Sequence, residues 1–176
     1  MRNEVGGKLK SLIDELQQKY SEEFTVHPIE DPEDMESALE ELQEAFPDNN
    51  VKFPLGVFEY IWQTYNAEPS STANFGIPTF PLTNSHASNK VAWTDIELDF
   101  DEELYNGELK FVVCVDVESK NYGKVCIINS AKKVCKVAES FEEFFNSFTR
   151  MMVDDFGGSE EEQAEIIKDF YEQYNL

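Results

Sequence analysis

The sequence predicts an α+β fold, in which a central, mostly antiparallel sheet is packed by N-terminal and C-terminal helices. Two observations predict it. Apolar residues recur at helical spacing through residues 4–66 and again after residue 139, whereas three short β-branched runs lie close together within residues 109–138. The short separations between these runs are typical of an antiparallel meander. At 176 residues the chain has the size of one domain, and we expect a single domain over residues 1–176.

Three helices are expected before the sheet. The first covers residues 4–20, where apolar side chains follow the helical period. The second begins at residues 31–33 (Asp-Pro-Glu), which provide an N-cap, a proline at the first helical position and an acidic first turn, and it ends before Pro47. The third lies in PLGVFEYIWQTYN, residues 54–66. One face of this helix is expected to carry Leu55, Phe58, Ile61, Trp62 and Tyr65.

The middle of the chain predicts loops first and strands later. Residues 67–89 are rich in Pro, Gly, Ser, Thr and Asn, which is typical of loops and short edge strands. Residues 90–107 begin with an alternation that fits either a strand or a short helix, and the pattern leaves both open. Residues 109–117 (LKFVVCVDV) have almost no polar break, which indicates a central strand covered on both faces. Two more strands are expected over residues 124–129 and 133–138.

The stretch AESFEEFFNSF, residues 138–148, predicts the helix that follows the sheet. Ser140 and Glu143 match a capping box, in which the Ser140 hydroxyl accepts from the Glu143 N–H and the Glu143 carboxylate accepts from the Ser140 N–H. The phenylalanines fall at i, i+3, i+4 and i+7 and form one apolar stripe: Phe141, Phe144, Phe145 and Phe148. A last helix, capped by Ser159, is expected over residues 160–175.

The charge of the chain is strongly negative. It has 36 Asp and Glu against 14 Lys and Arg, a net charge of −22, of which residues 1–50 hold −10, residues 51–153 hold −5 and residues 154–176 hold −7. Nucleic acids and anionic membrane surfaces would be repelled by such a chain, whereas a basic protein partner would be attracted. Solubility alone is the other explanation of this charge.

The location expected from the sequence is the cytoplasm. No apolar run reaches the roughly 18–20 residues that span a bilayer. The N-terminal residues lack the apolar core and cleavage site of a secretory signal. Three cysteines, an odd number, do not suggest a disulfide framework. A reduced protein is therefore expected.

Few residue patterns support chemistry. The two histidines are His27 and His86. His86 follows Ser85 in a polar stretch, but adjacency in sequence does not place the serine hydroxyl against the imidazole, so a catalytic pair is not indicated. The cysteines lie within apolar strands, where they are expected to pack as small hydrophobes: Cys114, Cys126 and Cys135. An EF-hand calcium loop counted from Asp99 fails, because position six is Leu104 instead of glycine. We expect no catalytic residue, no metal site and no cofactor.

The acidic stretch after residue 92 is the candidate partner-binding site. Six carboxylates lie there beside two aromatic residues, and aromatic anchors ringed by charge suit the recognition of a basic protein. The candidate residues are Trp93, Asp95, Glu97, Asp99, Asp101, Glu102, Glu103 and Tyr105. A solvated acidic loop without a partner is the alternative interpretation.

Residues 53–148 resemble the SUKH superfamily through the order of their motifs. A helix that follows a proline and ends in an aromatic-Asn pair (FPLGVFEYIWQTYN) precedes a tryptophan region at Trp93, the strands FVVCVDV and GKVCIIN, and then AESFEEFFNSF. The resemblance implies an α+β core over these residues, to which the helices at about 4–20 and 160–175 are additions.

The resemblance also implies a function. The best-known SUKH members are bacterial toxin-immunity proteins, and yeast regulators of cell-wall synthesis belong to the same superfamily. A non-enzymatic immunity protein that neutralises a cognate toxin is implied, and the negative charge suggests a basic toxin of the nuclease type. A regulatory scaffold that binds other proteins is the alternative within the superfamily, and a hydrolase built on Asp99 and Asp101 is a third interpretation. The sequence leaves the identity of the toxin and the oligomeric state open.

Overall fold

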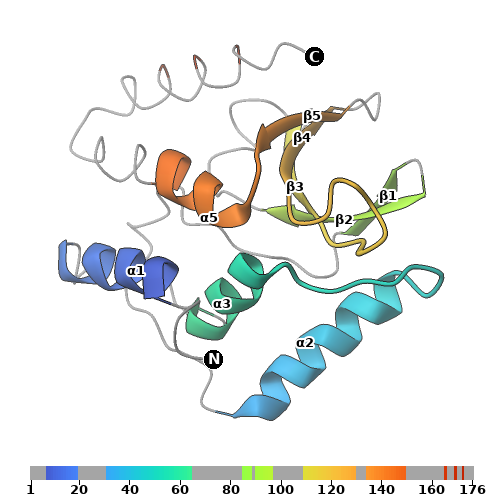
Figure 1. Cartoon of the computed structure of the whole chain (residues 1–176), viewed down its shortest axis with the longest axis horizontal. Coiled ribbons are helices and arrows are strands. Elements are labelled where there is room, and N and C mark those ends of the chain that lie inside the picture. The colour runs from blue at the N-terminus through green and yellow to red at the C-terminus, as the bar shows by residue number, and fades with distance from the viewer. Residues whose placement is uncertain are drawn as a thin grey trace.

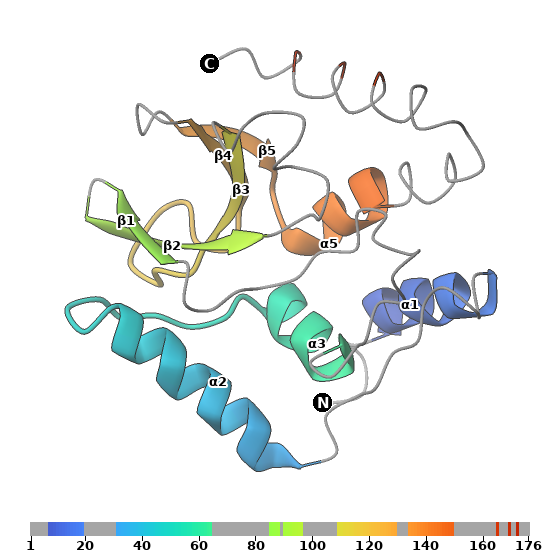
Figure 2. The ribbon, with the colours of Figure 1, turned by 180° about the vertical axis from the view of Figure 1, so that it is seen from behind.

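The computed structural model describes residues 7–19, 31–64, 85–88, 90–96, 109–129 and 134–149, together with residues 165, 169 and 172. These residues form an α+β fold, with a curled antiparallel sheet on one side and helices on the other (Figure 1). The same division is visible from behind (Figure 2). The predicted fold class is therefore confirmed.

The three N-terminal helices are present. Helix α1 covers Gly7–Lys19, α2 covers Pro32–Ala45 and α3 covers Leu55–Thr64. The predicted start of α2 is confirmed, because the Asp31 side chain accepts a hydrogen bond of 3.0 Å from the Glu33 N–H. Each helix contributes buried apolar side chains to one core: Leu9, Leu12, Ile13, Met35, Ala38, Leu42, Val57, Tyr60 and Ile61.

The orientation of α3 differs from the expected one. Val57, Tyr60 and Ile61 form its buried face, while Leu55 is 54% exposed. Phe58 and Trp62 are only partly buried at the edge of the core. The reason is that large apolar side chains occur on two opposite sides of α3, so its hydrophobic period does not determine which side faces the core.

Five strands form one sheet in chain order. They are β1 (Ser85–Ser88), β2 (Val91–Ile96), β3 (Leu109–Cys114), β4 (Val125–Asn129) and β5 (Val134–Ala138). All neighbours are antiparallel, in the order β1-β2-β3-β4-β5. The predicted meander is thus confirmed, and β1 is a short edge strand within the loop-rich region. The choice left open at residues 90–107 is resolved as a strand for its first part.

Strand β3 is covered on both faces, as predicted. Phe111 and Val113 join the large core cluster on the side of the helices. Val112 and Cys114 belong to a second cluster on the opposite face. The remaining buried members of that second cluster come from β2 and β4: Trp93, Cys126 and Ile128. Alternate side chains of one strand therefore face two separate apolar environments.

The phenylalanine helix is confirmed in part. Helix α5 covers Phe141–Phe144 and continues as a π-helical turn, η1, over Phe145–Thr149. The Ser140 hydroxyl accepts from the Glu143 N–H at 3.1 Å, but the Glu143 carboxylate accepts from the N–H of Glu139 instead of Ser140, at 2.9 Å. Phe141, Phe144 and Phe145 are buried, whereas the Phe148 side chain lies outside the described residues.

The predicted last helix lies mostly outside the described residues. Three of its residues are described, and all three are helical and exposed: Glu165, Asp169 and Glu172. They are four and three positions apart, a spacing that places them on one side of a helix.

Candidate functional site

The predicted partner-binding residues are divided by the structure. Trp93 and Asp95 lie on β2 and are only 2% and 3% exposed, so neither side chain belongs to the surface. The other candidates lie outside the described residues: Glu97, Asp99, Asp101, Glu102, Glu103 and Tyr105. Trp93 is directly opposite Cys114 in the sheet, on the covered second face, which explains its burial.

Asp95 is a buried carboxylate with a cation beside it. Its Oδ2 lies 3.4 Å from the Nζ of Lys110, whose side chain is half exposed. Asp95 is opposite Val112 on β3, and Lys110 lies two residues earlier on the same strand and face as Val112. The Asp95 carboxylate is therefore paired with a lysine and buried beside the second apolar cluster, so it is not part of the exposed acidic surface.

The cysteines have the properties of packed thiols. Cys114 and Cys126 are buried and Cys135 is partly buried, and none forms a disulfide. Burial raises the pKa of the Cys114 thiol, and it raises the pKa of Cys126 to about 12. A nucleophilic cysteine needs a thiolate near neutral pH. Within the described ranges, no group of three His, Cys, Asp or Glu side chains is arranged to hold a metal ion.

We expect alkylation of the folded protein by iodoacetamide to modify Cys135 well before Cys126, because only Cys135 is partly accessible. Equal labelling of both thiols in the folded chain would contradict this assignment.

Folding also raises the pKa of Cys126, so the protonated thiol stabilises the fold below about pH 9, and this stabilisation is lost as the pH rises to about 12. Urea unfolding between pH 7 and pH 11 measures the loss, which Cys126→Ala should reduce and Cys135→Ala should not.

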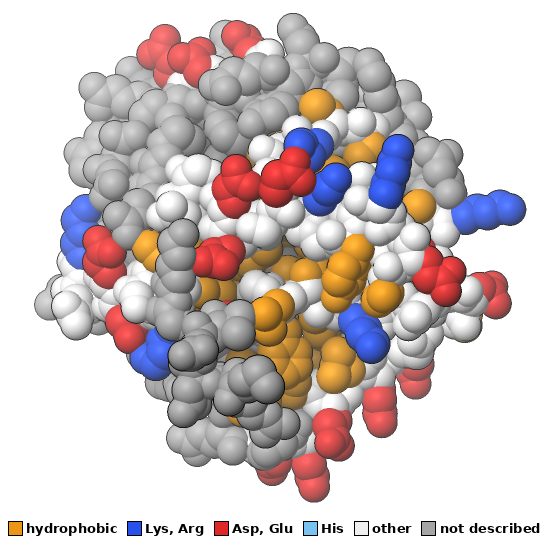
Figure 3. Space-filling model, in the orientation of Figure 1, with side chains coloured by type: hydrophobic (Ala, Val, Ile, Leu, Met, Phe, Trp, Pro, Cys, Tyr) orange, Lys and Arg blue, Asp and Glu red, His pale blue; other side chains and the backbone are white. Residues whose placement is uncertain are grey.

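Helix α2 carries a row of exposed carboxylates. Met35, Ala38 and Leu42 face the core, so the acidic residues between them point to solvent. The exposed carboxylates of this row are Glu33, Glu36, Glu40, Glu41, Glu44 and, just beyond the helix, Asp48. No Lys, Arg or His occurs in the helix. Acidic side chains line the outer edge of this face in the region of α2 (Figure 3). We call these six residues the α2 carboxylate row.

The net charge of −10 over residues 1–50 already indicated an acidic surface in this part of the chain. The prediction placed the partner-binding site at residues 93–105 instead, because aromatic residues there accompany the carboxylates. The packing of Met35, Ala38 and Leu42 against the core is what turns the α2 carboxylates outward.

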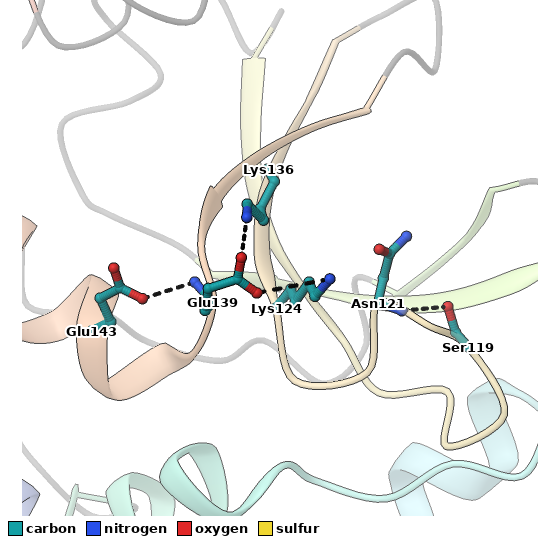
Figure 4. Close-up of polar contacts among 6 residues, drawn as sticks. All are labelled: Ser119, Asn121, Lys124, Lys136, Glu139 and Glu143. Atoms are coloured by element: carbon teal, nitrogen blue, oxygen red, sulfur yellow. Dashed lines mark hydrogen bonds and ion pairs between the residues drawn. The ribbon is translucent and has the colours of Figure 1, made fainter.

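A second charged group joins β5 to α5 and is largely neutralised. Lys124 and Lys136 both approach the carboxylate of Glu139, and Lys124 Nζ lies 3.7 Å from Glu139 Oε2 (Figure 4). The hydrogen bond from Lys136 lowers the pKa of Glu139, and the same bond raises the pKa of Lys136. Figure 4 also shows the nearby turn, in which the Asn121 N–H donates to the Ser119 hydroxyl at 3.1 Å. Exposed pairs of this kind contribute little stability.

Helices α3 and α5 meet with two carboxylates beside the contact. A Cβ at Gly56 would lie 3.5 Å from the Glu142 backbone nitrogen, so the helices approach closely there. The pKa of Glu59 is raised mainly by partial burial and, to a smaller extent, by the negative charge of Glu142. The second of these causes is a carboxylate of α5, so α5 adds negative charge beside this side of α3.

Comparison with known proteins yields no relative: no family model, curated protein or solved structure matches the chain. Among the described helices, none combines the length and the apolar character that crossing a membrane requires.

Proposed function

We propose that this chain is a single SUKH-like domain that acts as a non-enzymatic immunity protein, binding and neutralising a cognate basic toxin of the nuclease type. The observation that carries the proposal is the α2 carboxylate row, which lies on a helix without a single cation in a chain of net charge −22. The motif order over residues 53–148 supports the immunity class.

The proposed mechanism is occupation without chemistry. A nuclease presents Lys and Arg side chains to the phosphates of its substrate, and a row of carboxylates can occupy the same positions. Charge complementarity of this kind accelerates association and weakens as salt screens it, with a Debye length of about 8 Å at physiological ionic strength. The inhibitor makes and breaks no covalent bond.

Two acidic segments are candidates for the contact, and charge-neutralising variants separate them. Glu36→Gln, Glu40→Gln and Glu44→Gln together remove half of the α2 carboxylate row. Asp99→Asn, Asp101→Asn and Glu103→Gln remove the same charge from the stretch predicted as the site. A matched control with the same change in charge is available at exposed positions near the C-terminus: Glu165→Gln, Asp169→Asn and Glu172→Gln.

The test is co-expression with the toxin encoded beside this gene, followed by co-purification at low and high salt. Wild-type chain should restore growth and retain the toxin at low salt, with retention falling steeply as salt increases. The α2 triple variant should lose at least about tenfold in affinity, which corresponds to about 1.4 kcal/mol, whereas the C-terminal control should bind almost normally. Failure to restore growth with any neighbouring toxin would reject the immunity function. Stable recruitment of a cellular enzyme in its place would favour the regulatory scaffold.

A further inference from the structure

Helix α3 exposes apolar side chains on the side opposite its buried face. Leu55 is 54% exposed, and Phe58 and Trp62 are partly buried at the edge of the core. The rings of Phe58 and Trp62 are stacked, with centroids 6.1 Å apart and planes 25° apart. These three residues occur at i, i+3 and i+7, so they form one line along the helix, which we call the α3 stripe.

Tyr122 extends the apolar surface beyond the start of α3. It is 36% exposed, and its hydroxyl donates to the backbone oxygen of Phe53 at 3.3 Å. The neighbouring Gly123, at φ +80°, packs against Pro54, which directly precedes Leu55. Leu55 and Tyr122 are the large hydrophobic residues classed as exposed in the described part of the chain, and the fold brings both to the same end of α3.

The face drawn in Figure 3 shows hydrophobic side chains gathered near its centre, in the region of α3 and α2, with acidic side chains along the α2 edge. Single exposed hydrophobes are ordinary on a soluble protein, but contiguous ones with aromatic members are typical of protein-binding sites. The stacked aromatic pair also presents a preformed surface, because its rings already pack against the core.

The charge around the stripe selects the kind of partner. Neither α2 nor α3 contains a Lys, Arg or His, and together they hold seven carboxylates: Glu33, Asp34, Glu36, Glu40, Glu41, Glu44 and Glu59. Glu59 lies between Phe58 and Trp62 in the chain, and its pKa is raised first by partial burial and second by the negative charge of Glu142. Leu39 of α2 packs on the same core cluster as Phe58 and Trp62, so α2 and α3 share one core. The charged side chains within α2 and α3 are all carboxylates, which suits a segment that is apolar on one side and cationic on the other.

The length of the stripe fits a helix. Leu55 and Trp62 are seven positions apart on α3, which is about 10 Å at the rise of an α-helix. Apolar anchors at i, i+3 or i+4, and i+7 of a docked amphipathic helix cover the same length.

We propose that the α3 stripe, with Tyr122 at its end, is the docking site for a basic amphipathic helix of the partner protein. The apolar side of that helix lies on Leu55, Phe58 and Trp62, and its Lys and Arg residues face Glu59 and the α2 carboxylate row. This inference deepens the proposed function and rests on it for the identity of the partner.

The test uses designed peptides and the full chain. The probe is a helical Leu/Lys peptide of about 18 residues, roughly five turns, with leucines on one side. A scrambled peptide of identical composition keeps the charge and loses the apolar side. Isothermal titration calorimetry measures both affinities, and acrylamide quenching of tryptophan fluorescence reports the site, because Trp62 is partly accessible whereas Trp93 is 2% exposed.

The amphipathic peptide should bind at least about tenfold more tightly than the scrambled one, and it should protect Trp62 from quenching. Leu55→Gln should reduce the affinity to that of the scrambled peptide. The matched control is Ala45→Gln, which adds the same side chain at an exposed position of α2 and should change nothing.

Several results would overturn the docking site. Equal binding of the two peptides would show that charge alone accounts for the affinity. Unchanged binding of the amphipathic peptide by Leu55→Gln would show that the contact lies elsewhere. A dimer in sedimentation that Leu55→Gln dissociates would make a second copy the occupant. Peptide docking at Leu55 without rescue from any toxin would reject the immunity function only, whereas full rescue by Leu55→Gln would reject the docking site only.

Discussion

Phe144→Ala is expected to lower the free energy of unfolding by about 3–5 kcal/mol. The Phe144 side chain is fully buried, and its ring centroid lies 5.1 Å from that of Phe111 on β3 and 6.2 Å from that of Phe141. Truncation removes the ring that joins α5 to the sheet and leaves a cavity between them. Equilibrium unfolding in urea measures the change as a lower midpoint with an unchanged slope.

Two neighbouring variants make this result specific. Phe144→Leu keeps an apolar side chain in the same space and should cost clearly less than the alanine variant. Asn146→Ala lies on the exposed side of the next turn and should change stability by less than about 0.5 kcal/mol. If the Phe144 and Asn146 alanine variants were equally stable, α5 would not be held to β3 by this ring.

Asp116→Ala is expected to cost about 2–3 kcal/mol. Its carboxylate is 6% exposed and accepts from the Asn49 side-chain amide at 2.9 Å and from the Glu118 N–H at 3.0 Å. Asn49 also donates to the backbone oxygen of Lys90 at 3.0 Å. Asp116 therefore connects the segment after α2 to the sheet, and its removal leaves donors without a partner in a site that water reaches poorly. Urea unfolding of the purified variant measures the loss.

A double-mutant cycle isolates this connection. Asn49→Ala alone, and combined with Asp116→Ala, should give a coupling energy of about 1 kcal/mol, because the two side chains share one hydrogen bond. Asp48→Ala removes an exposed carboxylate beside Asn49 and serves as the control, with an expected change below about 0.5 kcal/mol. Additive single-variant effects would show that the Asn49 amide and the Asp116 carboxylate act independently.

Much of the fold could be predicted from local sequence. The Asp31 cap and Pro32 determine where α2 begins, because both act on the backbone within one turn. The unbroken apolar run of β3 predicted burial on both faces, and the two clusters confirm it. The short connections between the runs predicted the antiparallel order, since parallel strands need longer crossovers.

Other features depend on how the chain runs from one element to the next and on which strands pair. The Glu143 carboxylate binds the Glu139 N–H instead of the Ser140 N–H, because the chain entering α5 comes directly from β5. Trp93 and Asp95 look like surface anchors beside an acidic stretch, but strand pairing with β3 places them on the covered second face. Side-chain alternation in a strand follows from its register, and the register depends on the partner strand.

The candidate docking surface shows the same limit. The periodicity of α3 predicts a helix, yet a helix with large apolar side chains on two opposite sides offers two possible buried faces. Packing against Phe141 and Phe145 buries Tyr60, whose ring centroid lies 5.1 Å and 5.3 Å from theirs, and so turns Leu55 outward.

The sequence by itself determined the α+β class, the starts of α2 and α5, the two-sided burial of β3 and the excess of negative charge, because each follows from residue type and spacing along a few turns or strands. Only the tertiary structure decided which apolar residues reach the surface and which carboxylates stand beside them. The physical reason is that exposure is a property of packing between segments far apart in the chain, such as Tyr122 and Phe53, which are 69 residues apart and share a hydrogen bond.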